Sequence, residues 1–342
     1  MNKLKNKKKE IIHLIHCNRK GGVEVGALKA QTELKNFINY KVKFIYKLKD
    51  NNYQKIKKGI LLIFTLIKIN RKVSIITSLW FSHLILFFVT FFNRDIRWIS
   101  FIHNSNYPSL LNKFISTKIT LYSNQIVFDS YSTGINFLKK NKIPKKNIIN
   151  YSFKNNYFPK INIKNWKKRI FDFVIVARNI NQKGFFKLEK FLTNSLENYK
   201  HKPRILIITD NLYKEVNLQK IRSNLKNHCE INIKLNLDNK LVLKYLSKSK
   251  YYLCLSKYEG FAITIAEALH CGCFIITTNV GEQKNYLNSK RKLILSSLNT
   301  KINFSNIEVK GSSTSNYLKS LAFFKKRVNF YSDQIIGLLQ YD

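Results

Sequence analysis

Short apolar runs alternate with amphipathic segments along the whole chain. Each run has the length and the β-branched or aromatic content of a strand that is buried in a parallel sheet. The segments between the runs have the longer apolar spacing of helices, so the pattern favours an α/β fold with parallel sheets. The expected strands are residues 11–16, 42–46, 73–79, 98–103 and 125–130 in the first half, and residues 171–177, 204–209, 230–235, 251–255 and 274–278 in the second.

The chain has 342 residues, more than one ordinary domain needs, and both halves show the same alternation of strands and helices. We therefore expect two Rossmann-like doubly wound domains, residues 1–160 and 161–342. The boundary is expected within residues 155–168, where Pro159, lysines and asparagines interrupt the pattern. Ligands of open α/β sheets bind at the carboxyl ends of the strands. Two such domains that face each other across a cleft would gather the residues that follow their strands.

The most informative stretch of sequence is residues 251–287. An aromatic-rich strand is followed by a loop, and then by an apolar, alanine-containing helix over residues 263–269. Gly272 stands where the end of that helix is expected, and a β-branched strand follows it. The stretch therefore predicts a strand, a loop, a helix and a second strand.

Two glutamates, Glu259 and Glu267, stand eight positions apart around the start of this helix. Ser256 and Glu259 have the S-x-x-E spacing of a capping box, which predicts that the helix begins there and that Glu267 lies roughly two turns inside it. At about 1.5 Å per residue the carboxylates would lie on the order of 12 Å apart. Glycosidases need carboxylates about 5 Å or about 6.5 to 9.5 Å apart. The spacing instead suits an extended polar ligand whose anionic part, such as a diphosphate, lies at the helix N-terminus.

This stretch resembles the E-x7-E signature of retaining GT-B glycosyltransferases, most closely glycosyltransferase family 4. The resemblance implies that Glu259 holds the hydroxyls of a donor sugar and that Glu267 binds the ribose of its nucleotide. It also implies that the backbone amides of Gly260, Phe261 and Ala262 hold the diphosphate. Ala262 replaces the second glycine of the usual G-F-G-L. The residues that match the signature are Ser256, Glu259, Gly260, Phe261, Glu267, Ala268 and Gly272.

A second match to the same family follows the expected strand 171–177. Arg178 and Lys183-Gly184 stand where the family has G-R-x-x-x-x-K-G, with Ala177 in place of the first glycine. The resemblance implies that Arg178 and Lys183 clamp the departing diphosphate. Breaking the sugar–phosphate bond releases negative charge, and two fixed cations stabilise that charge where it develops.

Two further matches lie in the first half of the chain. Gly21 and Gly22 precede a helical pattern over residues 27–37 and match a G-G-x-E loop that bends close to the donor phosphate in relatives. Backbone approaches a ligand that closely only where side chains are missing, so Gly22 is expected to contact the donor. His103, at the end of the expected strand 98–103, matches a histidine that lines the acceptor and donor-sugar pocket.

The resemblance covers nearly the whole chain and implies a GT-B architecture whose last helix packs back on the N-terminal domain. It implies transfer of a hexosyl group from a nucleoside-diphosphate sugar to a hydroxyl of a glycan or lipid-linked glycan, with retention of configuration at the anomeric carbon. Such reactions belong to bacterial surface polysaccharide or lipopolysaccharide synthesis. A donor phosphate oxygen would take the acceptor proton in a front-face substitution. Because the chain has no D-x-D motif, neither a metal nor another cofactor is expected. The candidate catalytic residues are Glu259, Arg178, Lys183 and His103.

The net charge of +42 favours anionic partners, although lysine abounds along the whole chain and much of the charge is compositional. Residues 53–72 combine an apolar body with flanking lysines and an arginine, as a helix on a membrane surface does. We therefore expect peripheral contact with an anionic membrane. Residues 75–92 have nearly the length of a membrane span, but they contain His83, serines and threonines, and we expect a strand and a core helix there.

The expected location is the cytoplasm, at the inner face of the plasma membrane. No signal peptide is recognisable before the first strand. The five cysteines are odd in number and form no C-x-x-C pair, as is usual for a chain that has neither disulfides nor a zinc site.

Other functions remain open on the sequence alone. A sugar-nucleotide epimerase has the same two-domain architecture, but it needs acid and base residues that no motif supplies here. The charge alone also fits a non-enzymatic protein that binds nucleic acid or membranes. Three donor motifs that converge on one cleft speak against nucleic acid as a partner. The chain could also be a degenerate, inactive transferase, because some motif positions, such as Ala177 and Ala262, differ from the family pattern.

Overall fold

The computed structural model describes residues 10–19, 21–103, 107, 109–142, 149–150, 163, 165–195, 199, 201–297 and 302–327. The chain divides into two compact units, the first of which extends to Asn156, while the second is Tyr157–Val328. The expected boundary at residue 160 and the expected return of the last helix fall on residues 151–162 and 328–342. Both ranges lie outside the described residues, so both expectations stay predictions.

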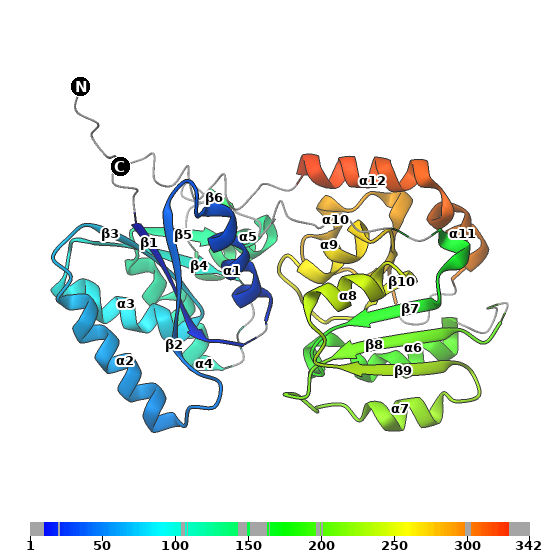
Figure 1. Ribbon diagram of the computed structural model, residues 1–342, viewed down its shortest axis with the longest axis horizontal. Coiled ribbons are helices and arrows are strands. Elements are labelled where there is room, and N and C mark those ends of the chain that lie inside the picture. Colours follow the sequence, from blue (N-terminus) through cyan, green and yellow to red (C-terminus); the bar gives the residue numbers. More distant parts are fainter. Residues whose placement is uncertain are drawn as a thin grey trace. The chain divides into compact units, whose positions relative to one another are not determined.

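Each unit contains a six-stranded sheet in which all pairs of neighbouring strands are parallel (Figure 1). In the first unit the order is β2-β1-β3-β4-β5-β6, and in the second it is β12-β11-β10-β7-β8-β9. The strands are β1 (Glu10–Cys17), β2 (Asn39–Tyr46), β3 (Val73–Ser78), β4 (Ile96–Ile102), β5 (Gln125–Phe128), β6 (Ile149–Asn150), β7 (Phe171–Val176), β8 (Arg204–Thr209), β9 (Glu230–Leu235), β10 (Ser249–Cys254), β11 (Phe274–Thr278) and β12 (Lys292–Leu295).

The helices lie between successive strands and beyond β12. They are α1 (Gly22–Leu34), α2 (Asn52–Ile67), α3 (Trp80–Phe92), α4 (Leu110–Thr117), α5 (Tyr131–Asn141), α6 (Leu188–Ser195), α7 (Leu218–Asn224), α8 (Asn239–Leu246), α9 (Ile263–His270), α10 (Gln283–Tyr286), α11 (Phe304–Ser312) and α12 (Thr314–Arg327). Short 3-10 turns include η1 (Ile119–Tyr122) and η4 (Asn181–Lys183).

The expected α/β fold is confirmed, and every expected strand is present within three residues at either end. The short edge strands β6 and β12 were not expected, because runs of two and four residues are too brief to stand out in the sequence. Helix α1 begins at Gly22, five residues earlier than expected. The two glycines of its first turns have low helix propensity, but Glu24 lies in the first turn, where the helix dipole favours an acid.

Alternate residues of the second sheet point into two separate cores. Phe173 and Ile175 of β7 pack in one cluster with side chains from α6, α7 and α11. Val174 packs in the other cluster, with side chains from α8, α9 and α12. Helices therefore cover both faces of this sheet, which explains why its central strands are apolar over most of their length.

In the first unit, α2, α3 and α4 pack on one face of the sheet. Residues 75–92 form most of β3 and all of α3, as expected, although Phe88, Phe91 and Phe92 at the end of α3 are exposed. Asn93 follows α3, and its Nδ2 donates to backbone carbonyls at the end of α2, including that of Ile69 at 2.9 Å. Among the described residues, no helix combines the length and the apolar character that crossing a bilayer requires.

Candidate active site

The loops that follow β7 and β10 are joined to each other, because these two strands are neighbours in the second sheet. The backbone N–H of Lys257 donates to the carbonyl of Gln182 at 2.8 Å, and the Gln182 side chain donates to the carbonyl of Tyr258 at 3.1 Å. Gly184 has φ +76°, and a Cβ at this position would lie 2.1 Å from the carbonyl oxygen of Leu255. Only glycine lets the two loops approach this closely.

The joined loops bring together two of the predicted site residues. Lys183 Nζ lies 2.6 Å from Glu259 Oε1, and the Ser256 hydroxyl donates to the same oxygen at 2.6 Å. The Lys183 and Glu259 side chains are 19 % and 10 % exposed, so water screens this ion pair less than a surface pair. The result is a fixed, mostly buried cation and carboxylate at the carboxyl edge of the sheet.

The capping box predicted at Ser256 and Glu259 was wrong. Helix α9 begins at Ile263, and its N-cap is Ala262, which makes no side-chain hydrogen bond to the helix. The Ser256 hydroxyl binds the Glu259 carboxylate instead of a helical amide. Ala262 adopts the left-handed conformation, with φ 56° and ψ 68°, which explains why the matching family pattern has glycine at this position.

Because α9 begins late, Glu267 lies only a little more than one turn inside it, not two. The side chain is 4 % exposed, and its Oε1 accepts a hydrogen bond from Asn239 Nδ2 of α8 at 2.9 Å. The predicted end of the helix is confirmed. Gly272 has φ +77°, and the amides of Gly272 and Cys273 bond back to the carbonyls of Leu269 and Ala268, as in a Schellman motif.

The loop from Glu259 to Ala262 rests on a second loop, which follows β11. Gly281 has φ +61°, and a Cβ on it would lie 2.4 Å from the carbonyl oxygen of Gly260. The Tyr286 hydroxyl donates to the carbonyl of Phe261 at 2.8 Å, and the two rings lie 5.0 Å apart. Gly281, shortly after the end of β11, was the available sequence signal for this support.

Arg178 lies at the end of β7, apart from the Lys183–Glu259 pair. Its guanidinium lies 5.6 Å from the centre of the Tyr213 ring, and it forms no ion pair with any described residue. The neighbouring Asn179 exchanges hydrogen bonds with the backbone of Val216 at 2.8 and 3.2 Å. The loop after β8 therefore fixes the segment that carries Arg178.

His103 follows β4 in the first unit and belongs to a chain of hydrogen bonds that leads into the core. Its Nε2 lies 2.8 Å from Ser78 Oγ, which lies 2.7 Å from Nε2 of His13. Nδ1 of His13 in turn lies 2.6 Å from the Tyr40 hydroxyl. A serine hydroxyl has one proton, so it donates to one imidazole and accepts from the other. Burial lowers the pKa of His103 well below its ordinary value, which keeps the ring neutral.

Gly21 and Gly22 lie at the start of α1, directly after β1. A Cβ on Gly21 would lie 2.5 Å from Oε2 of the buried Glu24 side chain. The missing side chain at Gly21 therefore makes room for a carboxylate within the helix. Both glycines and His103 follow strands of the first sheet, at its carboxyl edge.

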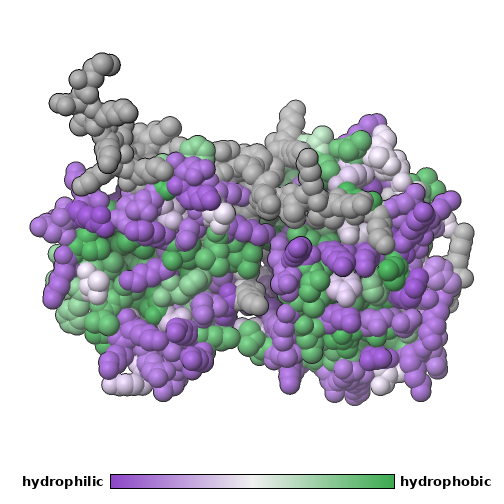
Figure 2. Space-filling view, viewed as in Figure 1, coloured by the Kyte–Doolittle hydropathy of each residue, from purple (hydrophilic) through white to green (hydrophobic). Residues whose placement is uncertain are grey.

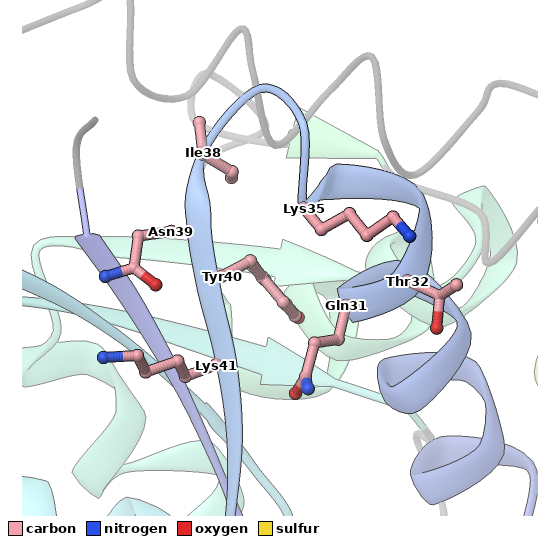
Figure 3. A pocket seen from close by; sticks show the side chains of 7 residues that line it. All are labelled: Gln31, Thr32, Lys35, Ile38, Asn39, Tyr40 and Lys41. Carbon is pink, nitrogen blue, oxygen red and sulfur yellow. The ribbon is translucent and has the colours of Figure 1, made fainter. Parts of the chain in front are cut away.

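A hollow of about 740 Å³ lies between the end of α1 and the start of β2 (Figure 3). It lies at the amino end of β2, whereas ligands of parallel α/β sheets bind at the carboxyl ends. We therefore do not assign the hollow to the candidate site. It is lined by Gln31, Thr32, Lys35, Ile38, Asn39, Tyr40 and Lys41.

Within the described part of the chain, no three His, Cys, Asp or Glu side chains form a group that could hold a metal ion. All five cysteines are buried free thiols. Burial raises the pKa of Cys229 and of Cys273 to about 11, so neither is a reactive thiolate at neutral pH.

Comparison with known proteins adds a family model and several similar folds. Residues 157–298, which include Arg178, Lys183, Glu259 and Glu267, match the family model described as Glycosyl transferases group 1. The capsular polysaccharide biosynthesis glycosyltransferase CapH of Staphylococcus aureus is 28% identical over 175 residues, which cover 50% of this chain and 47% of that protein. The match therefore spans about half the length of this curated relative.

Among solved structures, the Anabaena protein HepE in complex with UDP-glucose has a TM-score of 0.71 at 13% identity, and the match covers 97% of this chain and 100% of that one. The lipopolysaccharide outer core galactosyltransferase WaaB has a TM-score of 0.66 at 12% identity, with 96% and 98% covered. These likenesses show the fold, which is that of two parallel-sheet α/β domains of the GT-B type. The family model and the fold together support a GT-B glycosyltransferase.

The left-handed backbone at Ala262 gives a stability prediction. Replacing Ala262 by glycine should stabilise the second unit by about 1 kcal/mol, because glycine adopts positive φ without strain and is also the better N-cap residue. Urea unfolding of the full chain measures the change. Ala266→Gly is the matched control within α9, and it should destabilise by about 1 kcal/mol, since helical backbone gives glycine no such advantage. Equal losses in both variants would contradict the strain at position 262.

The buried histidines of the first unit give a pH prediction. Burial lowers the pKa of His13 and of His83 to about 3. Burial, with help from Arg19 and Lys55, lowers the pKa of His16 to about 4. The unfolded chain protonates its histidines near pH 6.5, so between these values it binds more protons than the folded chain. Above about pH 6.5 the neutral, buried histidines therefore do not lower the free energy of unfolding. Below that pH the free energy of unfolding falls as the pH falls.

Between pH 7 and pH 5 each of these histidines should lower the free energy of unfolding by about 2 kcal/mol. Urea titrations followed by near-UV circular dichroism at both pH values check this loss. The slope of the free energy of unfolding against pH reports how many protons the chain takes up on unfolding. His13→Gln should lower that number by about one, even if it also lowers stability overall. An unchanged pH slope in that variant would refute the assignment of His13 as neutral and buried.

Proposed function

We propose that the protein is a retaining glycosyltransferase that moves a hexosyl group from a nucleoside-diphosphate sugar to a hydroxyl of a glycan or lipid-linked glycan. The observation that carries the proposal is the Lys183–Glu259 ion pair, which the chain holds at the carboxyl edge of the second sheet, just before α9. The family model across this region is further support, and so is the similar fold of HepE, whose structure was determined with UDP-glucose.

The start of α9 suits the diphosphate of such a donor. The first backbone N–H groups of a helix have no partners inside the helix, and its dipole favours an anion there. Helices α2, α7 and α8 begin with an Asn or Asp side chain that accepts one of these hydrogen bonds, whereas Ala262 at α9 supplies none. We assign the amides at Gly260, Phe261 and Ala262 and the first turn of α9 to the donor diphosphate.

Lys183 would change partners when the donor binds. In the structure its ammonium group contacts the Glu259 carboxylate. A diphosphate at the start of α9 would compete for this ammonium group, and Glu259 would then accept hydrogen bonds from the donor sugar. Arg178 would contribute a second cation as the sugar–phosphate bond breaks, and Glu267 would accept a hydrogen bond from the ribose.

The proposed mechanism is a front-face substitution in which a donor phosphate oxygen takes the proton of the acceptor hydroxyl. In this mechanism His103 acts as a neutral hydrogen-bond partner of the substrates and not as a charged acid, because its pKa lies well below neutrality. Gly22, at the start of α1, would allow close approach to the donor phosphate. No metal takes part in the proposal.

We propose that the acceptor belongs to surface polysaccharide or lipopolysaccharide synthesis and is met in the cytoplasm, at the inner face of the plasma membrane. The supports for this are the names of two similar proteins, CapH and WaaB, and the exposed apolar and lysine-rich surface of α2. The expected lipid-linked acceptor would present its glycan at such a surface.

A thermal-shift panel of UDP, GDP, ADP and CMP tests the donor site. One diphosphate at about 100 times its dissociation constant should stabilise the protein by roughly 2.7 kcal/mol. Lys183→Ala should abolish this shift, whereas Lys190→Ala, which removes an exposed lysine from the same segment, should leave it unchanged. If no nucleotide stabilises the wild-type protein, or if both lysine variants respond equally, the site is wrongly assigned.

Glu259→Gln separates donor binding from transfer. The amide keeps the size of the side chain and an oxygen that accepts from Ser256, but it removes the charge that holds Lys183. Nucleotide binding should therefore persist, while the rate of transfer should fall at least about a hundredfold. Release of UDP and formation of glycoside from UDP-glucose and related donors measure the two steps. Donor consumption without glycoside in the wild-type protein would favour an epimerase instead.

A further inference from the structure

The hydrogen bonds that reach His103 form a line across the first sheet. Its four members come from neighbouring strands in the order β2-β1-β3-β4 and are Tyr40 on β2, His13 on β1, Ser78 on β3 and His103 directly after β4. The Tyr40 hydroxyl lies 2.6 Å from Nδ1 of His13. Ser78 Oγ lies 2.7 Å from Nε2 of His13 and 2.8 Å from Nε2 of His103. We call these four residues the histidine relay.

The histidine relay leads from the core of the first unit to the edge of its sheet. Hydrophilic residues on the surface of this unit lie among apolar ones, where water can bond to them (Figure 2). Tyr40, His13 and Ser78 are buried instead, and buried polar groups need partners within the protein. His103 is only partly buried, so the relay connects a buried network to a ring at the carboxyl edge.

The surroundings of Ser78 hold the relay in one arrangement. Leu79 has φ 73° and ψ 156°, a backbone conformation that costs free energy in every residue except glycine. Neighbouring groups must hold such a residue in place, and the Ser82 hydroxyl donates to the carbonyls of Ser78 and Leu79 at 2.6 and 2.9 Å. The Phe101 ring lies 4.2 Å from the His103 ring, between ring centres, and restricts its rotation.

The protons along the relay follow from its first donor. Burial lowers the pKa of His13 to about 3 and that of His103 well below its ordinary value, so each neutral ring has one N–H and one bare nitrogen. A phenol hydroxyl is more acidic than an imidazole N–H and is the stronger donor, so Tyr40 donates to Nδ1 of His13. Nε2–H of His13 then donates to Ser78, whose hydroxyl donates to Nε2 of His103. The ring proton of His103 is therefore on Nδ1.

We propose that the histidine relay fixes His103 as the Nδ1–H tautomer, and that this N–H donates a hydrogen bond to a hydroxyl of a bound substrate. Tyr40, His13 and Ser78 are positioning residues, because the bond that one ring nitrogen makes sets the proton on the other. A ring that exchanged tautomers would offer the donor only part of the time. The bond to the substrate rests on the proposed function, whereas the tautomer does not.

Nuclear magnetic resonance of the full chain with isotope-labelled histidine rings tests the tautomer. Correlations between the ring nitrogens and the carbon-bound ring protons distinguish a protonated nitrogen from a bare one. His103→Gln and His13→Gln each remove one set of signals and so assign the two rings. In the wild-type protein His103 should be protonated at Nδ1 and His13 at Nε2.

Three variants separate the steps of the relay. Ser78→Ala removes the link to His103, which should then show both tautomers, while His13 stays protonated at Nε2. Tyr40→Phe removes the donor that sets the direction, so both rings should show both tautomers. The matched control is Thr77→Val, which removes a hydroxyl at the adjacent and equally buried position, outside the relay. It should change neither ring.

Transfer from UDP-glucose measures the effect on the reaction. Ser78→Ala should lower kcat by about fivefold to tenfold, the loss expected for one neutral hydrogen bond, with an unchanged thermal shift by UDP. Adding Ser78→Ala to His103→Ala should cause no further loss, because both changes remove the same interaction. Ser78→Thr keeps the hydroxyl and should keep both the tautomer and the rate.

Three outcomes would overturn the proposal. The first is a wild-type His103 ring that is protonated at Nε2, and the second is a tautomer that Ser78→Ala leaves unchanged. The third is an additive loss in the double variant, since Ser78 would then affect transfer by another route. If the proposed function is wrong, no glycoside forms while the tautomers still respond to the variants, and only the bond to the substrate is refuted.

Discussion

The pairing of β7 with β10 is the contact on which the candidate site depends. Phe173 and Val174 pair with Tyr251 and Tyr252 in parallel register, although the strands are far apart in the chain. Parallel strands end at the same edge of a sheet, so this ladder places the two following loops together. Lys183 and Glu259, which are 76 residues apart, meet only for this reason. The apolar clusters on both faces of the sheet stabilise the ladder and therefore the site.

The few acidic residues and the many basic ones occupy different environments. Among the described acids, Glu24, Asp172, Glu267 and Glu282 are buried, and several others accept hydrogen bonds from defined partners, as Asp50, Glu189 and Glu215 do. The chain has 61 Lys and Arg against 19 Asp and Glu, so most cations have no acid available and lie in solvent. The net charge of +42 is therefore largely a surface property.

The two units provide different chemistry at the carboxyl edges of their sheets. The second unit offers a cation, a carboxylate and an uncapped helix start, which suit a charged diphosphate and a sugar. The first unit offers His103, which is linked through Ser78 to His13 in a neutral hydrogen-bonded chain. Neutral hydrogen-bond groups suit the hydroxyls of a sugar or acceptor. The same burial that keeps these histidines neutral makes the first unit sensitive to acid.

The sequence by itself determined the longer strands, the parallel sheets and the glycine that ends α9, because each depends on local pattern or on a single backbone conformation. The start of α9 and the partner of Ser256 were decided by tertiary structure. The spacing S-x-x-E is the same whether the serine hydroxyl binds a helical amide or a carboxylate, and only the pairing of Glu259 with Lys183 distinguishes the two. The exposure of large apolar side chains on α2, α3 and α4 also required the structure. Apolar residues read alike in sequence whether they face the core or solvent, and the packing of α3 between α2 and α4 decides which of them remain exposed.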